Sequence, residues 1–175
     1  MVQRYLITGG AGFIGSNYAD HLLSRGAKVT IFDNLSRRGA DKNLAWLRET
    51  HGADSFELAV GDVREAGALD SLAGRVDVIA HLAGQVAVTS SVIDPRTDFE
   101  INALGTFNAL ESIRKSGNKP FVIYSSTNKV YGEMNEHKLA EQKTRYRYAK
   151  LPHGLPETQQ LDFHSPYGCS KGTAE

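Results

Sequence analysis

The chain has 175 residues, the length of one ordinary domain and enough to bury a core without covalent cross-links. Its 20 basic and 20 acidic side chains cancel, so no global field attracts nucleic acid or anionic lipid. The single cysteine, Cys169, excludes an intramolecular disulfide framework and a multi-cysteine zinc site. No apolar run approaches the roughly 20 residues that cross a bilayer. The histidines lack a metal-binding spacing such as H-x-x-x-H. We therefore expect a globular, cytoplasmic protein without a bound metal ion.

Short apolar runs alternate with longer stretches of helical spacing along the chain. The apolar runs predict five β-strands, over residues 5–8, 28–33, 55–60, 76–81 and 120–125. The helical spacing predicts helices over residues 13–25, 42–51, 66–73 and 99–115, and a last helix that opens at Tyr167. Strands that alternate with helices are joined by right-handed crossovers, so the pattern predicts an α/β fold with a parallel sheet covered on both faces.

Two of these helices have a stripe, a row of mostly apolar residues at helical spacing, which we expect to face the core. In residues 13–25 this stripe is Ile14, Tyr18 and Leu22. In residues 99–115, spacings of four, four, three and three predict an inward stripe of Phe99, Ala103, Phe107, Leu110 and Ile113.

Residues 132–165 form the least regular region, which is polar and has no clean periodicity. A structureless loop of this length is uncommon inside a compact domain and is usually functional. Within it, basic residues alternate with Tyr146 and Tyr148. Because the net charge is zero, this pattern fits a solvated loop, or a contact with a substrate diphosphate or a partner subunit, better than a nucleic-acid platform. The chain stops about two turns into its last helix, so we expect it to be part of a longer protein.

A glycine-rich segment joins the first strand to the first helix. Gly9, Gly12 and Gly15 have the spacing G-x-x-G-x-x-G, a variant of the Rossmann fingerprint G-x-G-x-x-G. One glycine permits the tight turn, another lets the backbone approach a pyrophosphate, and the third permits close packing of helix on strand. The helix N-terminus then offers unpaired N–H groups to the diphosphate. The predicted fold is therefore a Rossmann-type, doubly wound parallel sheet.

Acidic residues follow the second and third strands. Asp33 comes 24 residues after Gly9, where a carboxylate accepts hydrogen bonds from the adenosine ribose and repels a 2′-phosphate. This favours NAD over NADP, although Arg37 and Arg38 close behind leave a phosphate-binding role open. Asp62 suits either a hydrogen bond from the adenine amino group or simple turn chemistry.

Tyr167 and Lys171 are four residues apart, so a helix places them on one face. A phenol ordinarily has a pKa of about 10, and a neighbouring ammonium favours its ionised form. Tyr167 is thus a candidate base, and Lys171 is also a candidate to hold the nicotinamide ribose. Thr127, which follows the fifth strand, is suited to orient the substrate oxygen. A Y-x-x-x-K pair alone is a weak signal, and the catalytic interpretation depends on its combination with the glycine turn and Asp33.

Six segments together resemble the extended short-chain dehydrogenase/reductase class of nucleotide-sugar epimerases and dehydratases: TGGAGFIG, FDNLSRRGA, HLAGQVAV, DFEINALGTFNALE, YSSTNKVYG and LDFHSPYGCSKG. The resemblance implies a catalytic group of Thr127, Tyr167 and Lys171, with Tyr167 as the base. It implies an NAD cofactor with contacts at Gly9, Gly12, Phe13, Ile14, Gly15, Asp33, Asn34, Ser36, Arg37, Asp62, Val63, Leu82, Ala83, Gln85, Asn102, Ser125, Tyr167 and Lys171.

The resemblance also implies a domain organisation and partners. Residues 1–175 would be the NAD-binding domain, and a C-terminal domain that grips the nucleotide-sugar substrate would follow in a longer chain. Members of the class commonly form homo-oligomers through a bundle of helices, for which the helices around Phe99 and Tyr167 are the candidates here.

The pair Asn128-Lys129 narrows the reaction that the resemblance implies. Sugar 4,6-dehydratases of the class carry Asp-Glu directly after the threonine, and decarboxylating relatives carry a glutamate, whereas this chain has neither acid. The difference favours an epimerase that oxidises a sugar carbon and re-reduces it from the opposite face. The segments STNKVYG and LDFHSPYGCSKG, with TRY near Thr144, are most similar to epimerases that act at C2 of a CDP-linked sugar. A UDP-sugar 4-epimerase and a dinucleotide-binding module without activity stay open as alternatives.

Overall fold

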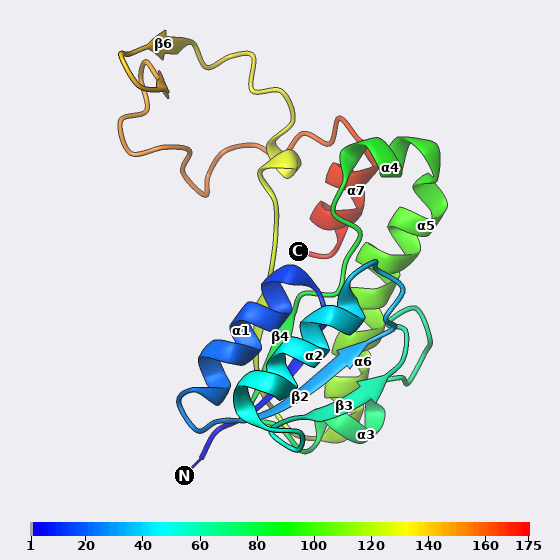
Figure 1. Ribbon diagram of the computed structural model, residues 1–175. Helices are drawn as coiled ribbons and strands as arrows, with labels where there is room; N and C mark the ends of the chain where they lie inside the picture. Colours follow the sequence, from blue (N-terminus) through cyan, green and yellow to red (C-terminus); the bar gives the residue numbers. More distant parts are fainter. Residues whose placement is uncertain (1) are drawn as a thin grey trace.

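The computed structural model describes residues 2–175, and its centre is a parallel sheet of five strands (Figure 1). The strands are β1 (Arg4–Thr8), β2 (Lys28–Asp33), β3 (Glu57–Val60), β4 (Val78–His81) and β5 (Phe121–Tyr124). Their spatial order is β3-β2-β1-β4-β5, so the order reverses between β1 and β4, where open α/β sheets bind ligands. All five predicted strands are confirmed, and β3 to β5 are each two residues shorter than predicted.

Helices cover both faces of this sheet, which confirms the doubly wound, Rossmann-type fold. On one face lie α1 (Phe13–Leu23) and α2 (Ala40–His51), and on the other α3 (Asp70–Ala73) and α6 (Gly105–Ser116). Because side chains alternate along a strand, neighbours in β1 serve different cores. Ile7 packs in the core under α2 with Leu47, whereas Leu6 packs in the core under α3 with Leu72.

A second group of helices stands above the carboxyl edge of the sheet (Figure 1). It consists of α4 (Val88–Ile93), α5 (Pro95–Phe99), the π-helical turn η1 (Glu100–Leu104), which continues directly into α6, and α7 (Pro166–Thr173). The last helix packs against α4, α5 and η1, and against the short 3-10 helix η2 (Asn128–Tyr131). This arrangement brings the C-terminal helix, with its tyrosine and lysine, back over the sheet.

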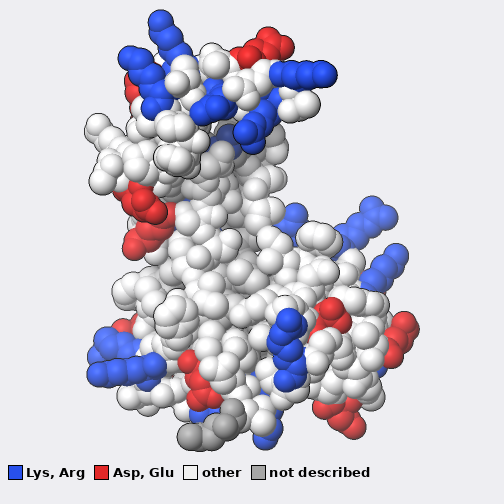
Figure 2. Space-filling view, turned by 90° about the vertical axis from the view of Figure 1, so that its left-hand side faces the viewer, with Lys and Arg blue, Asp and Glu red and all other residues white. Residues whose placement is uncertain are grey.

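Residues 132–165 project away from the rest of the domain (Figure 1). They are the least regular part of the domain, as predicted, but they contain a small antiparallel hairpin of β6 (Leu139–Glu141) and β7 (Tyr146–Tyr148) that was not predicted. Strands of three residues are too short to show a readable alternation in the sequence. Lysine and arginine side chains gather at the projecting end (Figure 2). Within residues 2–175, no helix has the length and apolar character needed to cross a membrane.

The predicted inward stripe of the long helix was largely wrong. Phe99, Phe107 and Leu110 are 46%, 62% and 47% exposed, whereas Ala103 is buried and Ile113 packs half-buried against the core under α3. The buried face instead consists of small and polar side chains, namely Asn102, Ala103, Thr106, Ala109 and Ser112. These residues allow the helix to lie close to the sheet and make directed hydrogen bonds, as Ser112 does to Asp70 over 2.6 Å. Specific polar contacts therefore set the rotation of this helix, against the preference of its large apolar residues.

The stripe predicted for α1 was partly right. Leu22 is buried and Tyr18 is half-buried, but Ile14 is 63% exposed. The helix packs closely on the sheet through Gly15, Ser16 and Ala19 instead. Ile14 belongs to the first turn, beyond the edge of the sheet, and so has no strand beneath it.

The fully buried centre of the sheet should carry most of the stability. Ile31 is 0% exposed in the core under α1 and α2, so we expect Ile31→Ala to lower the free energy of unfolding by about 2–5 kcal/mol. Val2→Ala removes two methyl groups from a 57% exposed side chain outside the strands. It should change the free energy of unfolding by less than about 0.5 kcal/mol. Urea unfolding monitored by circular dichroism measures both. Equal effects of the two substitutions would contradict the core assignment.

Candidate functional site

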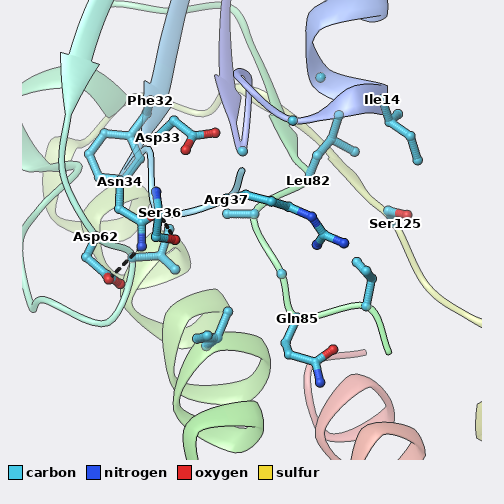
Figure 3. A pocket seen from close by; sticks show the side chains of 18 of the residues that line it. Ile14, Phe32, Asp33, Asn34, Ser36, Arg37, Asp62, Leu82, Gln85 and Ser125 are labelled. Atoms are coloured by element: carbon cyan, nitrogen blue, oxygen red, sulfur yellow. Dashed lines mark hydrogen bonds between the residues drawn. The ribbon is translucent and has the colours of Figure 1, made fainter. Parts of the chain in front are cut away.

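A cleft of about 580 Å³ lies along the carboxyl edge of the sheet (Figure 3). This volume is within the range of small-molecule sites. The segments that follow each of the five strands contribute to its wall, together with η1 and α7. The cleft is lined by every predicted cofactor contact except Asn102, and also by Phe32, Gly61, Gly84, Val86, Ile101 and Ser126.

The glycine turn after β1 has the geometry that the spacing predicted. Gly9 has φ of +69°, and a Cβ there would lie 2.7 Å from the backbone nitrogen of Ala83, so the segment after β4 leaves no room for a side chain. A Cβ on Gly15 would collide with the carbonyl oxygen of Gly9, which shows how closely α1 approaches the turn. Both glycines are therefore required by backbone packing.

The N-terminus of α1 opens on the cleft without a protein cap. Its N-cap residue is Gly12, which has no side chain to bind the first N–H groups, and the first turn carries no acidic residue. The N–H groups of the first turn are left without intrahelical acceptors, and the helix dipole adds positive potential there. Phe13, Ile14 and Gly15 all line the cleft. This end of the cleft is built to receive an anionic group such as a diphosphate.

Asp33 fixes the turn and still has hydrogen-bonding capacity. One carboxylate oxygen accepts the N–H of Ala11 over 3.0 Å and the other accepts the N–H of Leu35 over 2.8 Å. Each carboxylate oxygen has a second acceptor position, so Asp33 can also accept from two hydroxyl groups in the cleft. The first hydrogen bond ties the glycine turn to the end of β2.

Asp62 is already engaged by protein partners. It accepts the side chain of Asn34 over 2.9 Å and forms an ion pair with Arg64 at 2.7 Å. The hydrogen bonds from Arg64 are the main reason that the pKa of this carboxyl lies far below its ordinary value. In Figure 3, the side chain of Arg37, from the segment that follows β2, extends over the cleft. Arg38 does not line the cleft, so Arg37 is the one of the two arginines that is placed to contact a molecule in it.

Tyr167 and Lys171 lie one turn apart on α7, and both line the cleft. Ser165 is the N-cap of the helix, and its hydroxyl accepts the N–H of Gly168 over 3.0 Å. Pro166 follows in the first turn. The N–H of Tyr167 donates to the buried hydroxyl of Ser91 on α4 over 3.1 Å. The predicted sharing of one helical face is thus confirmed, and α4 fixes the start of the helix.

The ammonium of Lys171 is held in a mostly buried position. It donates to the carbonyl oxygen of Ser125 over 2.5 Å and lies 4.2 Å from the ring centre of Tyr124. Burial lowers the pKa of Lys171 to about 8, against the opposing influence of Glu175 and Asp98. Burial and the nearby lysine also lower the pKa of His81 to about 4, so this histidine is neutral and bridges Thr8 and Thr106.

Two predicted site residues lie outside the wall of the cleft. Asn102 is 2% exposed and sits behind the wall, where it accepts the N–H of Gln85 over 2.9 Å and donates to its carbonyl over 3.2 Å. Thr127 is the N-cap of η2, and its hydroxyl accepts the N–H of Lys129 over 3.3 Å. Ser125 and Ser126 line the cleft at the end of β5 instead.

The lining residues that the prediction did not include are of two kinds. Phe32, Gly61 and Gly84 lie at or directly after strand ends, and their position was a usable signal. Ile101 reaches the cleft from the π-helical turn, which has no signature in the sequence. Among residues 2–175, no cluster of His, Cys, Asp or Glu could hold a metal ion.

The fold and this site together define a member of the extended short-chain dehydrogenase/reductase class. Within it, the chain belongs to the GDP-mannose 4,6 dehydratase family, whose model matches residues 6–175. A CDP-paratose 2-epimerase of Salmonella typhi is 49% identical over 99% of this chain and 51% of its own length. The chain thus spans about half the length of the curated relatives it matches.

Solved structures of nucleotide-sugar epimerases have the same fold. A UDP-glucose 4-epimerase of Thermus thermophilus in complex with NAD is 32% identical, with a TM-score of 0.73 over 98% of this chain and 48% of that chain. The Bifidobacterium longum UDP-glucose 4-epimerase in complex with NAD+ and UDP is 28% identical, with a TM-score of 0.75 over 98% of this chain and 46% of that chain.

The buried ammonium predicts a specific dependence of stability on pH. Lys171 has its pKa lowered from 10.5 to about 8, so between these pH values the unfolded chain binds more protons than the folded one. The penalty of burying the charge is complete below about pH 8 and disappears as the pH rises toward 10.5. The free energy of unfolding should therefore rise with pH in this window relative to Lys171→Met, which carries no charge. Urea unfolding of both proteins between pH 7.5 and 10.5 tests this, and a difference independent of pH would contradict it.

Proposed function

We propose that the chain is the NAD-binding and proton-transferring part of an epimerase that inverts C2 of a CDP-linked sugar, converting CDP-paratose to CDP-tyvelose. The observation that carries the proposal is the presence of Tyr167 and Lys171, one helical turn apart, in the wall of the cleft that begins at the glycine turn. The 49% identity to a CDP-paratose 2-epimerase supports the choice of sugar. The domain that grips the nucleotide sugar would lie in further chain, since the relatives are about twice as long.

The residues of the cleft fit NAD. The uncapped N-terminus of α1 suits the diphosphate, and the two free acceptor positions of Asp33 suit the hydroxyls of the adenosine ribose. Leu82, Ala83 and Gln85 would pass along the middle of the dinucleotide, and Lys171 would reach the second ribose. NAD held by these residues would supply hydride transfer to and from the sugar carbon.

Proton transfer is assigned to α7. Tyr167 takes the proton from the sugar hydroxyl when that carbon is oxidised and gives it back when the carbon is reduced. Lys171 lies one turn after Tyr167 on the same face of the helix, so its ammonium faces the same part of the cleft. Thr127 is proposed to orient the substrate oxygen, and this requires the first turn of η2 to bring its hydroxyl to the cleft when substrate binds. The absence of an acid at positions 128 and 129 leaves oxidation and re-reduction at a single carbon as the supported chemistry.

NAD binding and the preference for NAD over NADP can be tested on the 175-residue chain. We expect tighter binding of NAD, because Asp33 repels a 2′-phosphate. Asp33→Ser removes the repulsion and should narrow the preference by about tenfold or more, which corresponds to about 1.4 kcal/mol. Isothermal titration calorimetry with both dinucleotides measures the ratio, and Asp54→Ser, at a carboxylate remote from the cleft, is the matched control. Equal affinity of the unchanged chain for NAD and NADP would contradict the role of Asp33.

Turnover requires a substrate domain, which a fusion to the C-terminal half of the Salmonella typhi relative can supply. We expect this fusion to epimerise CDP-paratose, and Tyr167→Phe to reduce kcat roughly 10²- to 10⁴-fold with NAD affinity retained, because only the proton-transferring hydroxyl is removed. Tyr131→Phe is the control for loss of a tyrosine hydroxyl in the adjoining 3-10 helix. Assay of UDP-sugars in parallel distinguishes a 4-epimerase. A folded fusion that binds NAD and turns over none of these sugars would indicate a non-catalytic module.

A further inference from the structure

A buried polar network behind the cleft joins α5, η1 and α7. Asp98 on α5 and Ser170 on α7 are 1% and 0% exposed, and the hydroxyl of Ser170 donates to Oδ2 of Asp98 over 2.5 Å. The side-chain amide of Asn102 donates to Oδ1 of Asp98 over 3.3 Å and to the Ser170 hydroxyl over 3.1 Å. Since Asn102 also binds the backbone of Gln85 in the wall, the network connects Asp98 to two sides of the cleft.

The geometry of these bonds is that of an ionised carboxylate. Both oxygens of Asp98 act as acceptors, one from a hydroxyl and one from an amide. An O–H···O distance of 2.5 Å lies in the range of a hydroxyl bound to a carboxylate, whereas neutral pairs are most often about 2.7–2.8 Å apart. Burial raises the pKa of Asp98, and the bond from Ser170 and the charge of Lys171 oppose this rise without cancelling it. A buried negative charge is stable only with such partners.

Lys171, the residue after Ser170, has no carboxylate within ion-pair distance among the residues that the structure describes. It is only 8% exposed, so its ammonium needs negative potential from somewhere close by. Two carboxylates act on it, Glu175 and Asp98. Glu175 is exposed to water, which screens its charge, whereas Asp98 acts through the protein interior.

We propose that Asp98 is a positioning residue for proton transfer: it holds α7 through Ser170 and supplies the buried negative charge that keeps Lys171 protonated beside Tyr167. The role assigned to Tyr167 rests on the proposed function, whereas the effect of Asp98 on Lys171 does not. Asp98 lies outside the Y-x-x-x-K motif. It comes from a helix some seventy residues earlier in the chain, one turn before the amide of Asn102.

The titratable groups around Lys171 come from several elements. His81 on β4 is neutral because its pKa is lowered to about 4, and Tyr124 on β5 is neutral because burial raises its pKa. Tyr167 and Glu175 lie on or next to the same helix as Lys171, and Asp98 approaches from α5. Replacing Asp98 by asparagine therefore removes the one buried carboxylate from this set.

The experiment follows the titration of Lys171 directly in the 175-residue chain. Lysine labelled with ¹³C at Cε is observed by NMR from pH 6 to 11, and the signal absent from Lys171→Met identifies Lys171. We expect Asp98→Asn to lower the pKa of Lys171 by about 1 unit, as loss of a nearby opposite charge does. Asp94→Asn, at an exposed acid in the turn that begins α5, should leave it unchanged. An unchanged Lys171 titration in folded Asp98→Asn would overturn the proposal.

A second measurement does not depend on the stability of that variant. In the unchanged chain, the Lys171 signal should show a small additional inflection at the pH where the ¹³C-labelled carboxyl of Asp98 titrates. Ser170→Ala should shift the pH of that inflection and the titration pH of Asp98 by the same amount. Absence of this inflection would also overturn the proposal. In the fusion, Asp98→Asn should shift the pH profile of kcat, whereas a merely structural role would lower kcat equally at every pH. If the fusion is inactive but Lys171 responds to Asp98, the proposed function fails and this inference stands.

Discussion

The arrangement of the site depends on placing a lysine ammonium in a position that water hardly reaches. Lys171 is held by the carbonyl oxygen of Ser125 and the ring of Tyr124, both at the carboxyl end of β5. Loss of water contacts disfavours the charged form of Lys171. The ammonium therefore stays in this position only because its side chain belongs to a helix that is itself fixed. The capped start of α7, its bond to Ser91 and its bond to Asp98 provide this fixation. Tyr167 then reaches the cleft because it lies one turn earlier on the same helix.

The opposite end of the cleft is organised by the backbone rather than by charges. Gly9 and Gly15 let the first turn, α1 and the segment after β4 approach one another more closely than any side chain permits. The result is an uncapped helix N-terminus beside an acid that still has acceptor positions. A ligand that spans the cleft would meet an acid after β2, then N–H donors at the start of α1, and a buried ammonium at the far end beside β5. An elongated molecule with a diphosphate near its middle and ribose hydroxyls on both sides matches this order.

The sequence allowed the sheet, the glycine turn and the tyrosine–lysine pair to be predicted because each has a local signature. Runs of β-branched residues, the spacing of the glycines and the four-residue spacing of Tyr167 and Lys171 can be read from the sequence without knowing which segments pack against them. The rotation of the continuous helix formed by η1 and α6 was not predictable in this way. It is set by Asn102, Thr106 and Ser112, whose partners come from distant segments, while Phe107 and Leu110 turn outward. The positions of Asn102 and Thr127 relative to the cleft depend on a π-helical turn and a 3-10 turn, and neither has a sequence pattern of its own.

The two parts of the domain are held together by different forces, and this difference suits the proposed chemistry. Both apolar cores lie within the sheet and the helices α1, α2, α3 and α6 that cover it, and neither contains a residue of α4, α5 or α7. The upper helices are instead joined by buried hydrogen bonds among Ser91, Asp98, Asn102 and Ser170. Apolar contacts stabilise without strong directional preference, whereas such bonds fix orientation and lose most of their strength when misaligned. The polar network can therefore hold α7 in one geometry.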